Sequence, residues 1–221
     1  MSEAPPLRAA IIPVTPLQQN CSLLWCTKTM RGAFVDPGGD LPRLKAAAGE
    51  SGVRIEKILL THGHIDHCGS AGIFAAELGV EIEGPHEEDR FWIDRLEEDG
   101  AKYGIPGQRF EPSRWLADGD EVSVGELTLF VRHCPGHTQG HVVFHHPESN
   151  LAFVGDVLFK GSIGRWDFPG GNHEQLVQSI TERLWPMGDS TAFVPGHGPM
   201  STFGHERATN PFVGDAALRA A

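Results

Sequence analysis

Three histidines and one aspartate stand within six consecutive positions of this 221-residue chain, in the segment 61–67, THGHIDH. With 12 histidines in the chain, such a pattern arises by chance roughly 0.002 times. His62 and His64 alternate, so both can point the same way from an extended segment. Asp66 and His67 follow at the turn into a helix and can reach a neighbouring point. Imidazole and carboxylate groups in this arrangement bind zinc, iron or manganese, so the segment predicts a metal site.

A common catalytic zinc site has three protein ligands and one water, so four candidate ligands this close together are too many for one such site. Their number indicates two metal ions. Further ligands must come from elsewhere, and three candidates each follow an apolar strand and a glycine. Glycine lets the backbone turn sharply there, so the next side chain projects beyond the end of the strand. The candidates are His137 in the segment CPGHT, Asp156 in FVGD and His197 in FVPGHG.

Short apolar runs and turn residues outline the elements that must position these ligands. Strands are predicted at 8–14, 20–26, 32–35, 55–60, 80–82, 121–124, 127–133, 141–146, 151–154 and 192–195, with a turn at 36–40. Helices are predicted at 41–49, 66–78, 86–96, 174–184 and from 201 onward, with a loop or lid at 99–113. This order fits an α/β fold, a four-layer αββα sandwich of two sheets with helices outside. Without a linker or repeat, residues 1–221 are predicted to form one domain.

The order of the motifs, HxHxDH, then PGHT, GD and PGHG, resembles the metallo-β-lactamase superfamily over nearly the whole chain. Within it the sequence is similar to the hydroxyacylglutathione hydrolases, or glyoxalase II, and most to the short bacterial YcbL-type branch. Further matching stretches are 12–14, 19–23, 35–40, 155–161, 164–165 and 204–207. The resemblance implies the four-layer metallo-β-lactamase-type sandwich.

The resemblance also implies a role for each ligand. The first metal would be held by His62, His64 and His137, the second by Asp66, His67 and His197, and both would be bridged by Asp156 and a hydroxide. Asp66 would thereby position the bridging hydroxide for catalysis. Two divalent ions per chain are expected, zinc first, with iron or manganese as alternatives because His/Asp ligation tolerates all three.

Such a centre is suited to hydrolysis of a thioester. Two divalent ions lower the pKa of a bridging water, and a metal stabilises the oxyanion that forms when hydroxide attacks a carbonyl. A thiolate, with a pKa of about 8.5–9, leaves unprotonated near neutral pH, whereas an amide nitrogen cannot. The sequence offers no obvious separate general acid, which favours the thioester. The resemblance implies hydrolysis of S-D-lactoylglutathione to D-lactate and glutathione, a step of methylglyoxal detoxification.

Recognition of glutathione is less well defined by the sequence. Larger glyoxalase II enzymes carry a C-terminal helical domain that helps to bind glutathione, but only 24 residues follow His197 (221 − 197). The segment 164–168 lies where relatives contact the thiol carrier. Arg165 could pair with a glutathione carboxylate, or Arg165 and Asp167 could form a structural ion pair, and both interpretations stay open. Trp166 stands where relatives often have a small polar residue.

Several residues near these motifs are expected to be structural. His133 and His141 flank His137 and are expected to orient ligands by hydrogen bonds. The aromatics Phe91, Trp92 and Tyr103 are expected in the core rather than at an entrance to the site. The cysteines form no CxxC pair and are expected to be buried thiols, namely Cys21, Cys26, Cys68 and Cys134.

Composition restricts the partners. The net charge is −11, and no cluster of Lys and Arg predicts a nucleic-acid surface. No run of 18 apolar residues predicts a membrane span, and residues 1–13 lack the pattern of a signal peptide. We therefore expect a cytoplasmic enzyme with a small-molecule glutathione thioester as substrate, and neither nucleic acid nor membrane as partner. The oligomeric state is not fixed by the sequence.

Other functions stay open at this point. A persulfide dioxygenase shares the superfamily frame and uses one iron held by two histidines and one carboxylate. A lactonase or esterase would use the same ligands. A non-catalytic, metal-stabilised binding module is disfavoured, because closed structural zinc sites are usually rich in cysteine. Metal stoichiometry and oxygen uptake with glutathione persulfide would discriminate between thioesterase and dioxygenase.

Overall fold

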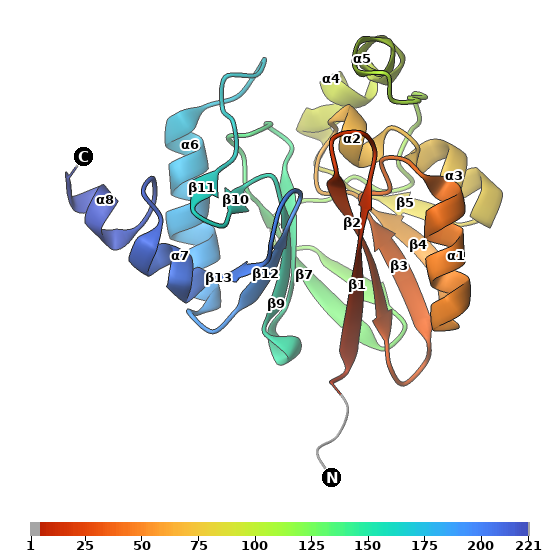
Figure 1. Cartoon of the computed structure of the whole chain (residues 1–221), viewed down its shortest axis with the longest axis horizontal. Coiled ribbons are helices and arrows are strands. Elements are labelled where there is room, and N and C mark those ends of the chain that lie inside the picture. The colour runs from red at the N-terminus through yellow and green to blue at the C-terminus, as the bar shows by residue number, and fades with distance from the viewer. Residues whose placement is uncertain (1–4, 221) are drawn as a thin grey trace.

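The computed structural model describes residues 5–220, in which two β-sheets face each other with helices on both outer sides (Figure 1). The first sheet holds its strands in chain order, with β1 to β3 antiparallel and β3 to β5 parallel. Its strands are β1 (Leu7–Val14), β2 (Gln19–Cys26), β3 (Arg31–Val35), β4 (Arg54–Leu59) and β5 (Glu81–Glu83).

The second sheet is built from the later strands, in the order β13-β12-β9-β8-β7-β6. Strand β12 is parallel to β9, and β7 has the same direction because β8 is antiparallel to both of its neighbours. The carboxyl ends of β7, β9 and β12 therefore reach the same edge of the sheet. The strands are β6 (Glu121–Val124), β7 (Leu127–His133), β8 (Val142–His146), β9 (Leu151–Gly155), β12 (Ala192–Pro195) and β13 (Ser201–Thr202), and a separate ribbon pairs β10 (Leu158–Phe159) with β11 (Ser162–Ile163).

Helices lie on the outer face of each sheet, with α1 and α3 on one side of the molecule and α6 and α7 on the other (Figure 1). The helices of the first half of the chain are α1 (Leu41–Ser51), α2 (Ile65–Cys68), α3 (Ala71–Leu78), η1 (Glu87–Asp89), α4 (Arg90–Ile93) and α5 (Leu96–Tyr103). Those of the second half are η2 (Pro147–Ser149), α6 (His173–Gln178), the π-helix η3 (Ser179–Leu184), η4 (Trp185–Met187), α7 (Phe203–Thr209) and α8 (Asp215–Ala220).

Three apolar cores fill the spaces between the four layers. Leu24 and Phe144 lie between the two sheets, Leu44 lies between α1 and the first sheet, and Leu176 and Phe193 lie beneath α6. All five side chains are fully buried. Each sheet therefore buries both of its faces, and the predicted four-layer αββα sandwich is confirmed.

Two helix predictions and one loop prediction differ from the structure in extent. The helix expected at 66–78 is two helices, because Ser70 leaves helical backbone geometry (φ −99°, ψ 1°) between α2 and α3. The loop expected at 99–113 begins with the end of α5. An added Cβ at Gly100 would lie 2.6 Å from the carbonyl oxygen of Ile105, so the missing side chain lets the following segment pack against this helix. That tertiary contact outweighs the low helix propensity of glycine. The helix expected at 174–184 continues as a π-helix from Ser179.

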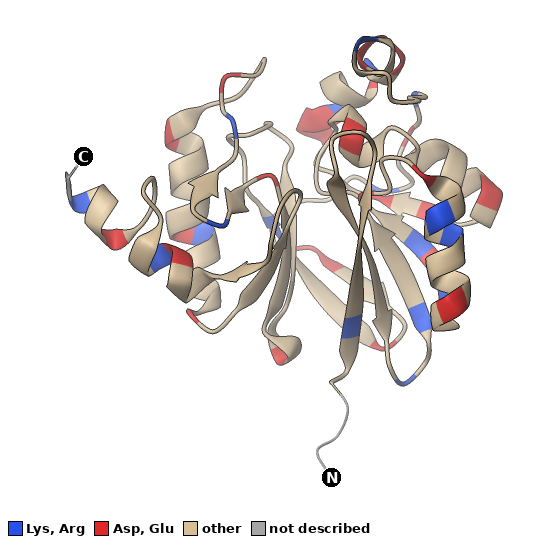
Figure 2. Cartoon of the chain, viewed as in Figure 1, with Lys and Arg blue, Asp and Glu red and all other residues tan. Residues whose placement is uncertain are grey.

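Basic and acidic side chains are interspersed along the helices and strands in Figure 2. None of the helices within residues 5–220 is long and apolar enough to cross a membrane. Residues 1–4 lie outside the described part of the chain. They belong to the stretch 1–13 that lacks the pattern of a signal peptide.

Candidate metal centre

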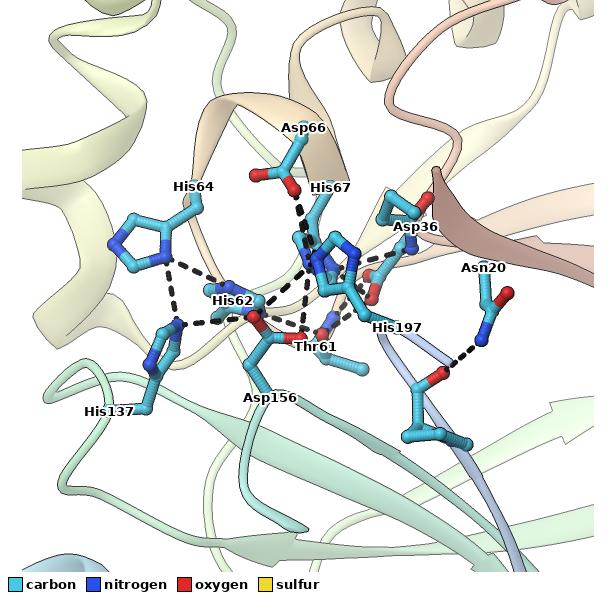
Figure 3. A network of polar contacts seen from close by, with 12 residues as sticks. Asn20, Asp36, Thr61, His62, His64, Asp66, His67, His137, Asp156 and His197 are labelled. Atoms are coloured by element: carbon cyan, nitrogen blue, oxygen red, sulfur yellow. Dashed lines mark hydrogen bonds and ion pairs between the residues drawn. The ribbon is translucent and has the colours of Figure 1, made fainter. Parts of the chain in front are cut away.

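All seven predicted ligands lie at one edge of the sandwich, at the ends of strands from both sheets (Figure 3). The HxHxDH segment follows β4 of the first sheet and runs into α2. His137, Asp156 and His197 follow β7, β9 and β12, whose carboxyl ends share an edge of the second sheet. Strand direction therefore brings together residues that are far apart in the sequence.

His62, His64 and His137 form the first cluster. Nδ1 of His64 lies 3.1 Å from Nε2 of His62 and 3.0 Å from Nε2 of His137. Burial lowers the pKa of His62 well below its ordinary value, and the neighbouring histidines lower it further, so this imidazole is neutral. Three ring nitrogens that meet at one point cannot all be satisfied by shared hydrogens. A cation there would accept all three lone pairs, so this cluster fits a metal ion.

Asp66, His67 and His197 form the second cluster. Nε2 of His197 lies 3.1 Å from Oδ2 of Asp66, and Nε2 of His67 lies 3.8 Å from the same oxygen. Nε2 of His67 is buried and has no hydrogen-bond partner among the described residues. A buried polar atom without a partner is costly, and a metal ion at this point would satisfy it.

The carboxylate of Asp156 lies between the two clusters. Its Oδ2 is 3.6 Å from Nε2 of His137 in the first cluster and 3.7 Å from Nε2 of His197 in the second. Its Oδ1 is 3.4 Å from Nε2 of His67. Burial alone would raise the pKa of Asp156, but the charges of His67, His137 and His197 hold it well below its ordinary value. An ionised carboxylate within reach of both clusters suits the bridging role that the resemblance implies.

Asp36, which lies in the turn predicted at 36–40, orients the second cluster. Its Oδ2 accepts a hydrogen bond from Nδ1 of His67 (2.9 Å), which directs Nε2 of His67 at the metal centre. Asp36 also accepts from the backbone N–H of Thr61 (2.7 Å) and from its hydroxyl (2.6 Å), and this hydroxyl lies 3.0 Å from Nδ1 of His62. Such outer hydrogen bonds fix the tautomer and orientation of metal-binding histidines.

Backbone carbonyl groups orient the two remaining Nε2 ligands. Nδ1 of His137 donates to the carbonyl oxygen of Arg165 (2.7 Å), and Nδ1 of His197 donates to that of Leu17 (3.2 Å). The side-chain amide of Asn20 donates to the carbonyl oxygens on either side of His197, at Pro195 (3.0 Å) and Gly198 (2.8 Å). The loop that carries His197 is therefore held by β2 of the opposite sheet.

The glycines before the strand-end ligands serve two different purposes. Gly136 and Gly155 have positive φ angles of 133° and 47°, as the turn argument requires. Gly196 is not among the glycines with positive φ, and it is needed for space. An added Cβ at Gly196 would lie 2.0 Å from Oδ1 of Asp156 and 2.6 Å from Cε1 of His67. Glycine is therefore required at position 196 by close packing and not by a sharp backbone turn.

The profile of the Metallo-beta-lactamase superfamily matches residues 14–197, which include all seven predicted ligands. The chain belongs to the metallo-beta-lactamase superfamily. It is 42% identical over 205 residues to the hydroxyacylglutathione hydrolase GloC of Haemophilus influenzae, a match that covers 92% of this chain and 96% of that protein. The superfamily resemblance and the fold expected from the sequence are thus confirmed.

Two solved structures are similar to this chain in fold. The BLEG-1 B3 metallo-beta-lactamase has a TM-score of 0.86 and 32% identity, and the match covers 93% of this chain and 99% of that one. TTHA1623, in a di-iron-bound form, has a TM-score of 0.83 and 34% identity, and the match covers 92% of this chain and 99% of that one. GloC is named a hydrolase, BLEG-1 a metallo-beta-lactamase, and TTHA1623 was solved with two irons bound. These names fix neither the metal nor the substrate of this chain.

In this superfamily member a cavity of about 820 Å³ opens beside the metal centre. Its lining includes the aromatic residues Phe91, Trp92, Tyr103 and Phe168. Phe91 and Tyr103 are 48% and 44% exposed, so the expectation that they belong to the core was wrong. Trp92 is buried, and its ring meets His64 edge-on with centroids 4.4 Å apart. An apolar face on α4 and α5 has the same periodicity whether it faces a core or a cavity, which explains the error.

Arg165 lies in the wall of this cavity, and its guanidinium stacks over the Phe168 ring at 4.2 Å. Its Nε donates to Oδ1 of Asp167 at 2.8 Å. Arg165 and Asp167 therefore form an ion pair, but both side chains are about two-thirds exposed (66% and 67%). An exposed pair of this kind contributes little to stability, so it leaves Arg165 available to a ligand.

The two histidines expected to orient ligands behave differently. His141 stacks on His62 with ring centroids 4.7 Å apart, and its Nε2 accepts from the backbone N–H of Asp156 (3.1 Å). His133 instead stacks on His86 and donates to the carbonyl oxygen of Gln139 (2.7 Å). All four cysteines are free and buried, as expected.

Proposed function

We propose that this chain is a hydrolase of glutathione thioesters, with S-D-lactoylglutathione as its first candidate substrate and two divalent metal ions, zinc first, as its cofactors. The observation that carries the proposal is a centre of seven convergent ligands that opens into a cavity with aromatic walls and a cationic residue. Similarity to GloC over nearly the whole of both chains supports the same reaction class. A cytoplasmic role in methylglyoxal detoxification would follow from that substrate.

The residues of the chain divide the work of this reaction. His62, His64 and His137 would hold one ion, Asp66, His67 and His197 the other, and Asp156 lies within reach of both. When bound, such ions supply a hydroxide nucleophile at neutral pH and polarise the substrate carbonyl. Asp66, 11% exposed at the cavity wall, would position the nucleophile. The thiolate can leave without a proton from a side chain.

Arg165 would bind a carboxylate of the glutathione part, since a guanidinium and a carboxylate match bidentately. Asp167 would hold the guanidinium from the solvent side, and Phe168 would fix its plane. Substitution Arg165→Gln should therefore raise KM while kcat changes little, because it removes binding rather than chemistry.

The deciding experiment follows the loss of S-D-lactoylglutathione thioester absorbance with purified protein of measured metal content. A kcat/KM above about 10⁴ M⁻¹s⁻¹ would support the proposal, since that value is the low end for typical enzymes. No turnover with metal demonstrably bound would refute it.

Three further substrates test the alternatives in the same preparation. Oxygen uptake with glutathione persulfide, together with one iron per chain, would favour a persulfide dioxygenase. Hydrolysis of a homoserine lactone would favour a lactonase. A chromogenic β-lactam belongs in the panel because BLEG-1, a B3 metallo-beta-lactamase, shares 32% identity with this chain.

A further inference from the structure

Asp89 is a fully buried carboxylate for which the proposed chemistry has no use. It ends η1 and stands at the N-cap position of α4, where aspartate commonly caps the helix, yet its side chain makes no capping hydrogen bond. Burial raises the pKa of this carboxyl to about 6, while its hydrogen bonds act to lower it. None of the ion pairs found among residues 5–220 involves Asp89, so hydrogen-bond donors alone offset the cost of its burial.

The donors to Asp89 come from two separate loops that carry predicted ligands. Oδ2 accepts from the backbone N–H of Gly63 (2.8 Å) and from the hydroxyl of Thr138 (2.8 Å). Oδ1 accepts from the backbone N–H of Gly140 (2.6 Å). Gly63 stands between His62 and His64, and Thr138 directly follows His137. One carboxylate therefore links the loops that supply all three ligands of the first cluster.

Close packing makes this link dependent on small residues. An added Cβ at Gly63 would lie 2.7 Å from Cβ of Trp92 and 3.0 Å from the carbonyl oxygen of Asp89. An added Cβ at Gly140 would lie 2.4 Å from the backbone nitrogen of Asp89. The backbone N–H of His86 also donates to the carbonyl oxygen of Gly140 (3.0 Å). Both loops thus lie directly against the segment that carries Asp89.

We propose that Asp89 is a positioning residue that sets the distance between the His62–His64 loop and the His137 loop, and thereby the geometry of the first metal site. It touches no substrate and no predicted ligand side chain. The inference rests on metal binding at the first cluster and is independent of which substrate the enzyme hydrolyses.

The test is the zinc affinity of Asp89→Asn, measured by competition with a fluorescent zinc chelator at a temperature well below the melting point. Asn offers one acceptor oxygen where two are used, so its amide group would face at least one backbone N–H. We expect zinc bound at the first cluster to weaken by about 10- to 100-fold, the range of losses when residues outside the ligand set that orient the ligands are substituted. Zinc at the second cluster should be held as in the wild type.

Two controls separate positioning from general loss of stability. Leu44→Ala opens a cavity in the core beneath α1, so its melting temperature should fall while its zinc affinity stays that of the wild type. Thr138→Val removes one donor to Asp89 and should weaken zinc binding, whereas Thr138→Ser keeps the hydroxyl and should retain it. Far-UV circular dichroism reports the fold of each variant.

Wild-type zinc affinity in a folded Asp89→Asn protein would overturn the proposal. If Asp89→Asn fails to fold, the Thr138 pair decides, and equal zinc affinity of the valine and serine variants would overturn it. A wild-type protein that binds zinc tightly but does not hydrolyse thioesters would refute the proposed function alone.

Discussion

Substitution Gly196→Ala should damage the metal centre through a single methyl group. The new Cβ would lie 2.0 Å from Oδ1 of Asp156, whereas ordinary contact begins near 3.4 Å, so one of the two must move by about 1.4 Å (3.4 − 2.0). The backbone at Gly196 cannot retreat easily, because its N–H donates to Gly155 and its carbonyl accepts from Asn20, both at 2.7 Å. Asp156 and His67 must therefore shift.

A misplacement of about 1 Å can cost about 10²-fold in rate, so we expect kcat/KM for the thioester to fall by at least that factor. Zinc affinity should fall by about 10-fold or more, since Asp156 faces both clusters. Zinc titration, thioester hydrolysis and far-UV circular dichroism are measured on the same preparation. Gly49→Ala on α1 is the matched control, because its new methyl would meet nothing within 4 Å. A folded Gly196→Ala protein with the zinc affinity of the wild type would refute the steric argument.

Three other perturbations have defined outcomes. His64→Ala should lower kcat/KM by at least about 100-fold because a ligand is lost, with an unchanged far-UV spectrum, and a collapsed spectrum would contradict this. When the free metal concentration is about 1,000 times the Kd, metal binding adds about 4 kcal/mol to the free energy of unfolding. Removal of the metal with a chelator should therefore lower the Tm measured by calorimetry by about 10 °C, and an unchanged Tm would speak against a bound metal. The pKa of His145 is lowered to about 4, mainly by burial and further by the charges of Arg132 and His146. Neutral His145 is thus favoured in the folded state, and the wild type loses stability as pH falls from about 6.5 to 4. In urea unfolding, His145→Gln should flatten this dependence by about 1 kcal/mol, after allowance for solvent screening, and parallel profiles would exclude the effect.

The seven candidate ligands stand out in the sequence because each one lies in a short local pattern. The HxHxDH segment needs only six positions, and the three strand-end ligands are marked by an apolar run and a glycine. The strands that carry them are also local features, since apolar runs between turn residues define them. The structure brings all seven predicted ligands to one edge of the sandwich.

The residues that orient the ligands could not be found in this way. Asp36 acts on His67, which is 31 positions away, and Asp89 acts on Thr138, which is 49 positions away. Neither aspartate has a local pattern that distinguishes it from a turn or a helix cap, the ordinary places for this residue type. Their roles follow from tertiary contact alone, as does the need for space at Gly196.

The division of the ligands between two sheets has a consequence for the order of folding. His62 and His197 are 135 positions apart (197 − 62), and His137 and Asp156 lie between them in the chain. When the first sheet has been synthesised, neither cluster is complete, because the first cluster still lacks His137 and the second cluster still lacks His197. Contacts between such distant positions form late, after the loop-closure cost of bringing the sheets together has been met. The set of seven candidate ligands thus becomes complete only after the chain has been made past β12 to His197, so metal ions would join an assembled scaffold rather than nucleate it.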